Sequence, residues 1–398
     1  MSSPEQRAVI SGIGQSAIGR RLGRGELDLT IEAALAAIAD AGLTRADIDG
    51  LAAYPGGVMG DTGGFAGPGT PTVQDALRLS LNWHSGGPEG PAQIQAVINA
   101  VIAVSAGLAR HVLVYRTVTE STAQGAGGRA GIGVGTSGVG GPFQWSLPFR
   151  AYSAANWLAM NARRHFHEFG TTREQLAAVA VAAREWALLN PAAWEKKPLS
   201  IADVLSSRMV SYPFTVRDCC LVTDGGGAII VTSAERAKSL KKPPAYVLGC
   251  GHSVTHANIT SMPDLTVTGA LASGKAAYAM AGLGPADIDA VELYDAFTIN
   301  TILFLEDLGF CKKGEGGAFV SGGRIAPGGS LAVNTNGGGL SYCHPGMYGL
   351  LLLIEAVRQL RGECGGRQVK DCEVAMAHGN GGVLSSQATV ILGAPSTL

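Results

Sequence analysis

The chain contains the same sequence pattern twice, 240 residues apart. Residues 41–50 read AGLTRADIDG and residues 281–290 read AGLGPADIDA. In each copy an alanine-rich run, IEAALAAIAD or LASGKAAYAM, comes first and a short apolar segment follows. Taken alone, the pattern is typical of a glycine that ends one helix, followed by residues that begin another. Because the flanking segments also repeat in order, we interpret it as an internal duplication.

The parallel extends to both sides of the repeated pattern. Upstream, VISGIG at 9–14 matches YVLGCG at 246–251. Downstream, an apolar helical run at 94–109 leads into HVLVYR, and a comparable run at 350–360 leads into CEVAMA. Each half therefore reads strand, helix, strand, loop, helix, strand. Strands that alternate with helices predict an α/β protein with a parallel or mixed sheet covered by helices.

The first half carries an additional segment at about residues 120–212. Residues 120–141 are rich in Gly, Ser and Thr and predict a loop, whereas residues 143–187 predict helix. Such excursions commonly carry substrate-binding loops. We therefore expect an N-terminal half at 1–241, which includes this insertion, and a C-terminal half at 242–398.

Charge and hydropathy exclude several classes of function. The net charge is −1 and the pI is about 6.7, so the chain lacks the basic footprint of a nucleic-acid-binding protein. No apolar stretch reaches the roughly 18 residues of a membrane span, and the amino terminus has no secretory signal pattern. The charged fraction of 15% and a mean hydropathy of +0.20 indicate apolar surface that a partner subunit covers. We expect a cytoplasmic protein.

Cofactor motifs are absent from the sequence. The seven cysteines form no CxxC pair, which fits a reducing compartment and argues against a zinc site in this chain. The segment GIGQSAIG at 12–19 lacks the acidic residue that follows a dinucleotide-binding glycine loop. We expect no metal and no permanently bound cofactor.

Four segments together resemble one known family. They are ELYDAF at 292–297, NTNGGGLSYCHPGMYG at 334–349, RDCCLVTDGGGAIIV at 217–231 and MAHGNGGV at 376–383. In these motifs the chain resembles the thiolase superfamily, and within it the lipid-transfer-protein branch, which is related to sterol-carrier thiolases and steroid side-chain aldolases. The resemblance covers essentially the whole chain. It implies the thiolase fold, with two duplicated five-layered α–β halves and a loop and helical insertion in the first half.

One departure from the thiolase pattern bears on the chemistry. Where thiolases carry a nucleophilic cysteine, residues 81–101 read LNWHSGGPEGPAQIQAVINAV and contain none. The nearest polar candidates are His84 and Ser85. A thioester-forming cysteine is needed for Claisen condensation or thiolysis, since the acyl group must wait on the enzyme between two half-reactions. The usual thiolase mechanism is therefore not expected here.

Retro-aldol cleavage of a β-hydroxyacyl-CoA remains possible without an acyl-enzyme. It needs a base for the β-hydroxyl proton and donors that stabilise a thioester enolate. The resemblance implies Tyr294 as the base and His344 as the group that polarises the thioester carbonyl. A free phenol has a pKa near 10, so Tyr294 needs a neighbouring donor or positive charge in order to act as a base at neutral pH. The alternatives are a packing role for Tyr294 and a helix-capping role for His344.

Further residues are candidates for the substrate pocket. We interpret Asp295 as a hydrogen-bonded support rather than as a base. Cys343 is the first candidate for a hidden nucleophile. The residues that we expect to line the pocket are Tyr342, Cys343, Tyr348, His378, Asn380, His84 and Ser85.

The resemblance also implies partners and leaves rival functions open. It implies a homodimer and a small OB-fold subunit of the DUF35 type, giving an α2β2 assembly in which only the partner would carry zinc.

The favoured function is a retro-aldolase that converts a β-hydroxyacyl-CoA with a steroid or other bulky side chain into a ketone or aldehyde and a shorter acyl-CoA. The alternatives are a Claisen-type thiolase or acyltransferase that acts on a β-ketoacyl-CoA, and a non-catalytic acyl-CoA or lipid carrier.

Overall fold

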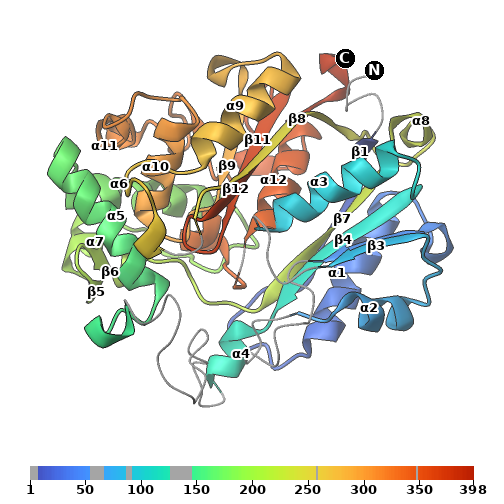
Figure 1. Ribbon diagram of the computed structural model, residues 1–398, viewed down its shortest axis with the longest axis horizontal. Coiled ribbons are helices and arrows are strands. Elements are labelled where there is room, and N and C mark those ends of the chain that lie inside the picture. Colours follow the sequence, from blue (N-terminus) through green and yellow to red (C-terminus); the bar gives the residue numbers. More distant parts are fainter. Residues whose placement is uncertain (1–7, 54–66, 87–91, 126–145, 257–258, 347) are drawn as a thin grey trace.

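A computed structural model describes residues 8–53, 67–86, 92–125, 146–256, 259–346 and 348–398 (Figure 1). The main sheet has ten strands. They are β1 (Ala8–Gln15), β2 (Gly50–Ala53), β3 (Trp83–Gly86), β4 (His111–Val118), β7 (Gly225–Ser233), β8 (Ala245–Val254), β9 (Ala290–Leu293), β10 (Ala332–Val333), β11 (Val374–Gly381) and β12 (Ser386–Gly393). The longer helices are α1 (Glu26–Asp40), α2 (Thr70–Leu77), α3 (Ala92–Ser105), α5 (Ala154–Phe169), α6 (Arg173–Leu188), α9 (Ala270–Ala281), α10 (Thr298–Asp307) and α12 (Gly349–Leu360).

The strand order confirms the duplication. Across the sheet it runs β10-β9-β11-β12-β8-β1-β7-β4-β2-β3. The five strands of the second half take the same spatial order as β3-β2-β4-β7-β1 of the first half. The two halves join where β1 and β8 pair antiparallel, with Val9 opposite Tyr246. Parallel and antiparallel pairs both occur, so the sheet is mixed.

The helices form layers around the two halves of the sheet. Helices α3 and α12 contact strands of both halves and therefore lie between them (Figure 1). Helix α1 packs on β1, β4 and β7, and α9 packs on β8 and β12. The sequence of α3, AQIQAVINAVIAVS, contains no charged residue, as expected for a helix that is covered on most sides. The five-layered α–β arrangement is thus confirmed.

Glycines explain how the repeated strand and helix pack so closely. In β1, a Cβ added at Gly12 would lie 2.4 Å from the carbonyl oxygen of Ala37 in α1. At the matching position of β8, a Cβ added at Gly249 would lie 2.2 Å from the carbonyl oxygen of Ala277 in α9. Any side chain at these positions would push the helix away from the sheet. The glycine pattern shared by VISGIG and YVLGCG therefore encodes the same strand–helix contact twice.

The insertion forms a separate group of elements on one side of the molecule (green in Figure 1). It contains α5, α6, α7 (Ile201–Ser206) and a hairpin of β5 (Met209–Ser211) and β6 (Phe214–Thr215). The helical prediction for 143–187 is correct for most of its length, but α5 begins only at Ala154, and Gly170, with φ of +71°, separates it from α6. Residues 143–145 lie outside the described part of the chain.

Two short elements differ from the sequence prediction. Residues 120–125 form helix α4 (Glu120–Gly125) where a loop was predicted, and the rest of that predicted loop lies outside the described residues. Residues 83–86 form the edge strand β3, which was not predicted. Its sequence, WHSG, has no apolar alternation, so only its pairing with β2 defines it. In the described part of the chain, no helix is both long and apolar enough to cross a bilayer.

Candidate active site

Tyr294 and His344, fifty residues apart in sequence, meet in the interior. The phenol oxygen of Tyr294 lies 3.0 Å from Nε2 of His344, within hydrogen-bonding distance. The two rings meet edge to face, with centroids 5.5 Å apart. Both residues are buried, with 7% and 6% of their surface exposed. The structure thus brings together the two residues that the sequence predicts as catalytic.

Burial keeps both members of this pair neutral. It lowers the pKa of His344 to about 4, well below the usual histidine value. Burial also raises the pKa of the Tyr294 phenol, and the nearby Cys220 and Glu120 act in the same direction. At neutral pH the phenol therefore keeps its proton, and the imidazole is uncharged. A neutral phenol and a neutral imidazole in contact form a unit that can move a proton without a permanent charge.

Backbone contacts fix the position of each ring. Tyr294 directly follows β9, and its backbone N–H donates to the carbonyl of His378 in β11 (3.0 Å). His344 follows a π-helical turn at Gly338–Tyr342. Its backbone N–H donates to Oγ1 of Thr223, which precedes the glycines of β7 (3.1 Å). The segment that closes the first half therefore holds the histidine of the second half.

Asp295 supports the π-helical turn. Its Oδ1 accepts the backbone N–H of Gly339 at 2.6 Å, and its Oδ2 accepts that of Leu340 at 3.4 Å. Burial raises the pKa of this carboxyl to about 6, although these hydrogen bonds act in the opposite direction. Asp295 is thus placed as a hydrogen-bonded support, in agreement with the sequence interpretation.

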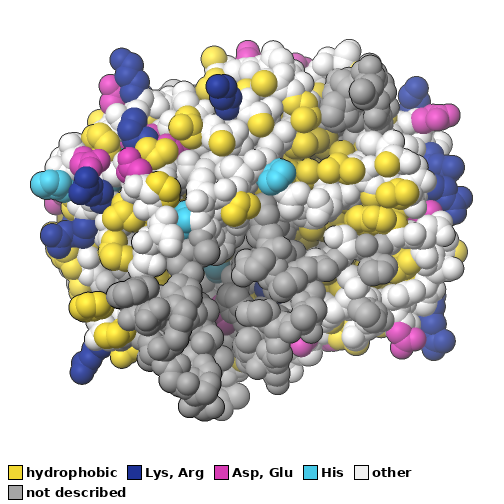
Figure 2. All heavy atoms as spheres, in the orientation of Figure 1, with side chains coloured by type: hydrophobic (Ala, Val, Ile, Leu, Met, Phe, Trp, Pro, Cys, Tyr) yellow, Lys and Arg dark blue, Asp and Glu magenta, His cyan; other side chains and the backbone are white. Residues whose placement is uncertain are grey.

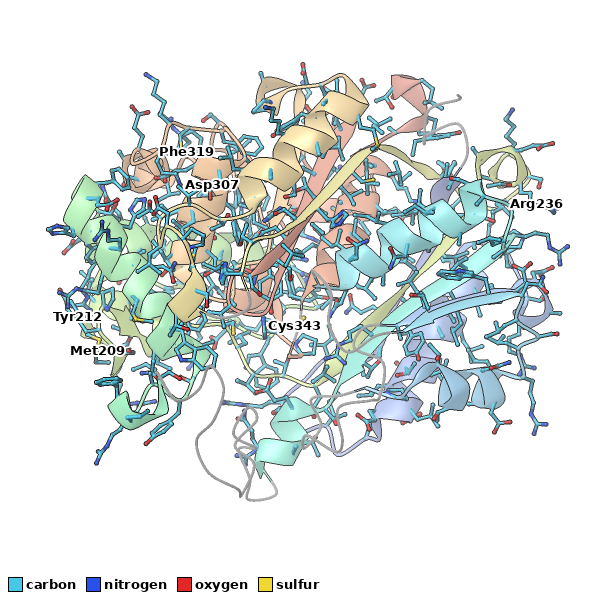
Figure 3. The ribbon with its side chains drawn as sticks, in the orientation of Figure 1. Met209, Tyr212, Arg236, Asp307, Phe319 and Cys343 are labelled. Atoms are coloured by element: carbon cyan, nitrogen blue, oxygen red, sulfur yellow. The ribbon has the colours of Figure 1, made fainter. Side chains whose placement is uncertain are left out.

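The residues that flank His344 surround the same site. The Tyr348 ring stacks on the His344 ring at 12° with centroids 6.3 Å apart, and its hydroxyl donates to Oδ1 of Asn336 (2.7 Å). Tyr342 donates from its hydroxyl to Oε1 of Gln15 (2.6 Å). Cys343 lies near the middle of the molecule (Figure 3) and is fully buried, which raises the pKa of its thiol well above the usual value. Burial thus disfavours the thiolate that a nucleophile requires.

His378 and Asn380 lie further along β11. The two ring nitrogens of His378 contact β12: Nδ1 lies 2.9 Å from Oγ1 of Thr389, and Nε2 lies 2.9 Å from Oε1 of Gln387. Burial lowers the pKa of His378 to about 3. The Oδ1 atom of Asn380 is buried and has no hydrogen-bond partner among the described residues. Among the described hydrogen bonds, the one that links these two residues to the Tyr294–His344 pair is accepted by the backbone carbonyl of His378.

His84 and Ser85 lie in β3, at the edge of the sheet of the first half. The backbone of His84 pairs with Leu51 and that of Ser85 with Ala52. The side chain of His84 lies outside the described part of the structure. Among the described contacts, none joins Ser85 to Tyr294 or His344.

Three residues near the pair were not predicted as site residues. Arg116 is a buried arginine in β4, Glu120 begins α4, and Cys220 is half-buried. The positive charge of Arg116 lowers the pKa of Tyr294, although burial and the two other residues raise it more. A single arginine within the otherwise largely apolar strand HVLVYRTV is the sequence signal that could have revealed this neighbourhood.

A cleft of about 320 Å³ lies next to segments that support the site. Its floor is formed by Cys219–Val222 and Leu340. Three arginines, Arg20, Arg184 and Arg217, also line it, together with Glu195, whose carboxylate pairs with Arg184 and Arg217. The backbone N–H of Cys220 donates to the carbonyl of Ala296, and that of Leu221 to the carbonyl of Gly339. The floor of the cleft is therefore bonded directly to the Tyr294–Phe297 loop and to the π-helical turn. Cys219 and Cys220 are half-buried at this cleft.

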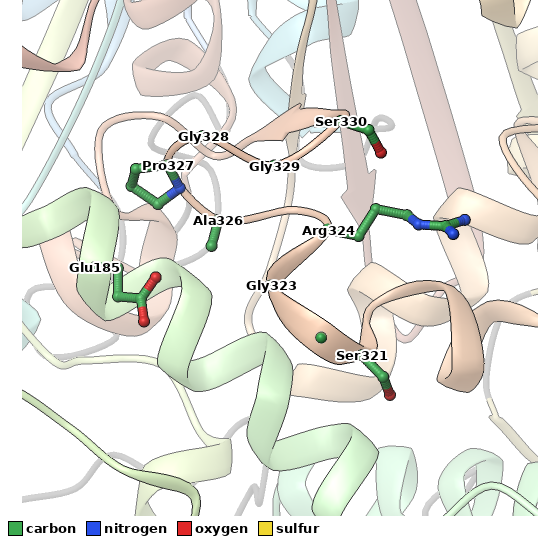
Figure 4. Close-up of a pocket in the computed structure, with 10 residues that line it drawn as sticks. Glu185, Ser321, Gly323, Arg324, Ala326, Pro327, Gly328, Gly329 and Ser330 are labelled. Carbon is green, nitrogen blue, oxygen red and sulfur yellow. The ribbon is translucent and has the colours of Figure 1, made fainter.

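A larger cavity of about 500 Å³ lies elsewhere, between α6 and a glycine-rich turn at 321–330 (Figure 4). Glu185 and Arg324 are its only charged lining residues, and both are exposed. No pair of buried titratable groups faces it, so we do not assign the chemistry to it. In the described part of the chain, no group of three or more His, Cys, Asp or Glu side chains is arranged to hold a metal ion.

Comparisons with known proteins agree with this geometry. Residues 251–394 match the family described as thiolase C-terminal domain-like. A steroid side-chain-cleaving aldolase of Thermomonospora curvata is 37% identical over 369 residues, which cover 89% of this chain and 90% of that protein. The chain belongs to the thiolase superfamily. Within the superfamily it lies in the aldolase branch, so it is a carbon–carbon lyase with a thiolase fold.

Two further relatives support this placement in the thiolase superfamily. A 17-hydroxy-3-oxo-4-pregnene-20-carboxyl-CoA lyase of Mycobacterium tuberculosis is 37% identical and covers 89% of this chain and 92% of that protein. The solved structure titled "Ltp2-ChsH2(DUF35) aldolase" matches with a TM-score of 0.87 and 34% identity, and covers all of both chains. These names describe the relatives and not this thiolase-fold lyase.

Proposed function

We propose that this thiolase-fold lyase cleaves a β-hydroxyacyl-CoA by a retro-aldol reaction in which Tyr294 and His344 act as one proton-transfer unit. The observation that carries the proposal is their buried contact of 3.0 Å between two neutral groups. The phenol oxygen faces the substrate hydroxyl and passes its own proton to Nε2 of His344. This assignment does not require a free phenolate, which burial disfavours.

The atoms balance over two steps. In the first, the β-hydroxyl proton moves to the oxygen of Tyr294 while the phenol proton moves to His344, the β-carbon–oxygen bond becomes a carbonyl and the Cα–Cβ bond breaks. The electron pair of that bond forms the enolate of the shorter acyl-CoA. In the second, the enolate takes the proton of Tyr294 at Cα while His344 returns its proton to the phenol, so that the pair is neutral again and the shorter thioester leaves. The reaction consumes no free CoA and no oxidant, and it forms no acyl-enzyme.

The substrate that we propose has two parts. The cleft suits the phosphates of CoA, since its three arginines outnumber its one carboxylate, Glu195, and guanidinium groups bind phosphate through paired hydrogen bonds. The cleft floor at Cys220 and Leu340 leads towards the Tyr294 loop. For the acyl group we propose a steroid or another bulky side chain, because both named relatives act on steroid-type substrates.

The assembly that we propose is a homodimer that also binds a small OB-fold subunit of the DUF35 type, as α2β2. The DUF35 subunit is inferred from the related structure, whose title names one. For the homodimer, Figure 2 shows hydrophobic side chains gathered over the part of the surface where α3 runs in Figure 1, and the exposed residues in and after α3 include Ile102 and Leu108. We propose that this chain holds no cofactor, that CoA enters only as the thioester substrate, and that any zinc lies in the partner subunit.

The decisive experiment measures products by mass spectrometry. The chain, co-expressed with a DUF35 subunit, is incubated with a β-hydroxyacyl-CoA that is branched at the β-carbon. We expect a ketone and a shortened acyl-CoA without added CoA, and a loss of at least about 100-fold in Tyr294→Phe, the size typical of a general acid–base group. Tyr278→Phe is the matched control, because the hydroxyl of the half-buried Tyr278 donates to the Leu308 carbonyl outside the site.

Two results would overturn the proposal. Cleavage that requires free CoA and a β-ketoacyl-CoA, together with an acyl group trapped on Cys343, would establish the Claisen-type acyltransferase. Tight binding of the CoA ester without turnover in the complete complex would establish a carrier.

A further inference from the structure

Helices α3 and α12 begin side by side next to the site. The backbone N–H of Leu350, in the first turn of α12, donates to Oε1 of Gln93, in the first turn of α3, at 2.6 Å. A Cβ added at Gly349 would lie 3.2 Å from Cβ of Gln93, so the two first turns are in contact. The two helices have 14 and 12 residues, and each directs the positive end of its dipole to this point.

Gln93 has a free hydrogen-bond donor at this junction. Only 2% of its surface is exposed, and its Nε2 atom has no hydrogen-bond partner among the described residues. The amide cannot be turned round, because Nε2 would then face the N–H of Leu350, donor against donor. A buried N–H without a partner costs free energy, so such groups are rare unless a ligand completes them.

A short series of contacts connects Gln93 with the Tyr294–His344 pair. Tyr348 directly precedes α12, and its ring stacks on the ring of His344. Gln93 contacts the two residues that follow Tyr348. The position thus combines an unpaired donor, two helix N-termini and the edge of the Tyr294–His344 site. This combination favours an oxygen atom with negative charge.

We propose that Nε2 of Gln93 donates to the thioester oxygen of the substrate as it becomes an enolate. The inference rests on the proposed retro-aldol function and adds the group that stabilises its product enolate. When the Cα–Cβ bond breaks, the electron pair is shared between Cα and this oxygen. A donor that bonds more strongly to the enolate than to the neutral thioester lowers the barrier to cleavage. Gln93 would therefore be a catalytic residue of this reaction.

Two substitutions separate this role from a structural one. Gln93→Met removes the Nε2 donor and also the Oε1 atom that accepts the Leu350 N–H. Gln93→Glu keeps an acceptor for the Leu350 N–H, but its ionised carboxylate has no donor. A matched control is Gln95→Glu, two residues along α3 on another face of the helix, where the side chain donates to Asn99. All variants are made in the full chain with the DUF35 subunit, and far-ultraviolet circular dichroism checks their folding.

We expect kcat to fall on the order of 100-fold in Gln93→Met, which is the size measured for the loss of one oxyanion-hole donor. In Gln93→Glu we expect a similar loss at pH 8 and partial recovery at pH 5, where the protonated carboxyl again donates. Gln95→Glu should stay within about twofold of wild type at both pH values. KM should change little in all three variants, because the donor acts mainly in the transition state.

One result would overturn the inference: wild-type kcat in Gln93→Glu at pH 8 would show that Gln93 only caps α12. A second assay does not depend on the cleavage substrate. The short acyl-CoA product, incubated in deuterium oxide, should exchange its α-protons with wild type and not with Gln93→Met. If wild type neither cleaves nor exchanges, the proposed function itself fails; if wild type does both and Gln93→Met keeps both, only the role of Gln93 fails.

Discussion

At the scale of single residues, burial determines which groups can take part in chemistry. His344 and His378 both lose surface to the interior, and burial lowers the pKa of each far below that of a free histidine. Only His344 faces a titratable partner, the phenol of Tyr294. The nitrogens of His378 are occupied by Thr389 and Gln387. Burial thus leaves both imidazoles neutral, but only His344 is placed to accept a proton, whereas His378 joins two strands of the sheet.

The low pKa of His344 predicts how the rate of the reaction declines at acid pH. Because His344 must be neutral to accept a proton, its own protonation should lower kcat/KM only as the pH approaches 4. The measurement is a pH–rate profile with branched β-hydroxyacyl-CoA, with enzyme stability checked at each pH. It compares wild type with Asp295→Asn, because the Asp295 carboxyl has a pKa of about 6 and supports the same turn. An inflection near pH 6.5, the value of a free histidine, in both proteins would contradict the assignment.

The same pKa shifts predict how stability depends on pH. The unfolded chain binds protons on its histidines below about pH 6.5, whereas folded His378 does so only near pH 3. The unfolded state therefore gains protons first, and the free energy of unfolding falls as the pH falls through this window, by up to about 1.4 kcal/mol per unit for one histidine. Urea unfolding at pH 7 and pH 5 should show a smaller acid loss in His378→Asn than in wild type. The exposed His167→Asn is the control, and equal acid losses in both variants would refute the prediction.

Sequence motifs singled out Tyr294 and His344 as candidates but not the residues around them. Tyr294 and His344 stand in motifs that resemble a known family, whereas their 3.0 Å contact depends on how two distant segments fold together. Gln93 gave no motif, because a glutamine in a helix is ordinary in sequence, and Arg116 gave only the signal of a single arginine in a largely apolar strand. Their importance comes from burial and from missing or nearby partners, which exist only in three dimensions.

At the scale of secondary structure, one short turn organises the site. The π-helical turn Gly338–Tyr342 positions Tyr342, Cys343 and His344, and Asp295 accepts two of its backbone N–H groups. Gly338 has φ of +63°, and a Cβ there would lie 2.0 Å from Oδ2 of Asp295. The turn therefore depends on a glycine both for its backbone conformation and for close contact with the carboxylate.

Gly338→Ala should disrupt this turn. We expect kcat to fall by more than about tenfold and the chain to lose about 1–3 kcal/mol of stability, the range for strained backbone positions. Activity and urea unfolding measure the two effects. Gly366→Ala is the matched control, since a Cβ there meets nothing within 4 Å, and it should change neither. Normal kcat in Gly338→Ala would show that the turn does not position the site.

The elements that sequence predicted correctly are those with long apolar patterns. Helices α3 and α12 and strands β1, β4, β7, β8 and β11 all follow apolar runs or alternation. The short elements α4 and β3 lack such patterns. Helix α4 is held from outside, because Asp224 accepts hydrogen bonds from the backbone and the side chain of Thr122. Tertiary contacts of this kind leave no periodic signal in the sequence.

At the scale of the whole molecule, the site requires both halves. Thr223 of the first half holds His344 of the second, and Gln93 of the first half bonds Leu350 of the second. The halves join through β1 and β8 and through a cluster centred on Asp40 at the end of α1. Two cations from later in the chain, Lys242 and Arg361, lie 2.6 Å and 2.8 Å from its carboxylate. A change at Asp40 therefore tests how strongly the halves depend on one another.

Asp40→Ala should weaken the whole fold rather than one element. Arg361 is almost fully buried and also donates to the carbonyls of Ser11 and Pro243, so removal of Asp40 leaves its charge without its carboxylate partner. We expect a loss of about 3 kcal/mol, as found when one member of a buried ion pair is removed. Burial would raise the pKa of Asp40, but hydrogen bonds from Lys242 and Arg361 outweigh it and lower the pKa. This stabilisation is therefore present at neutral pH and is lost as the pH falls below the usual aspartate range.

Urea unfolding, followed by circular dichroism and by activity, tests this prediction. Because both halves build the site, the two signals should decline together in Asp40→Ala, at a lower urea concentration than in wild type. Asp28→Ala, in the same helix but in an exposed pair with Arg24, should unfold like wild type. In the double variant Asp40→Ala with Arg361→Ala, the loss should be smaller than the sum of the single losses, because the second change removes the unpaired charge. Additive losses would show that the Asp40 cluster does not couple the two halves.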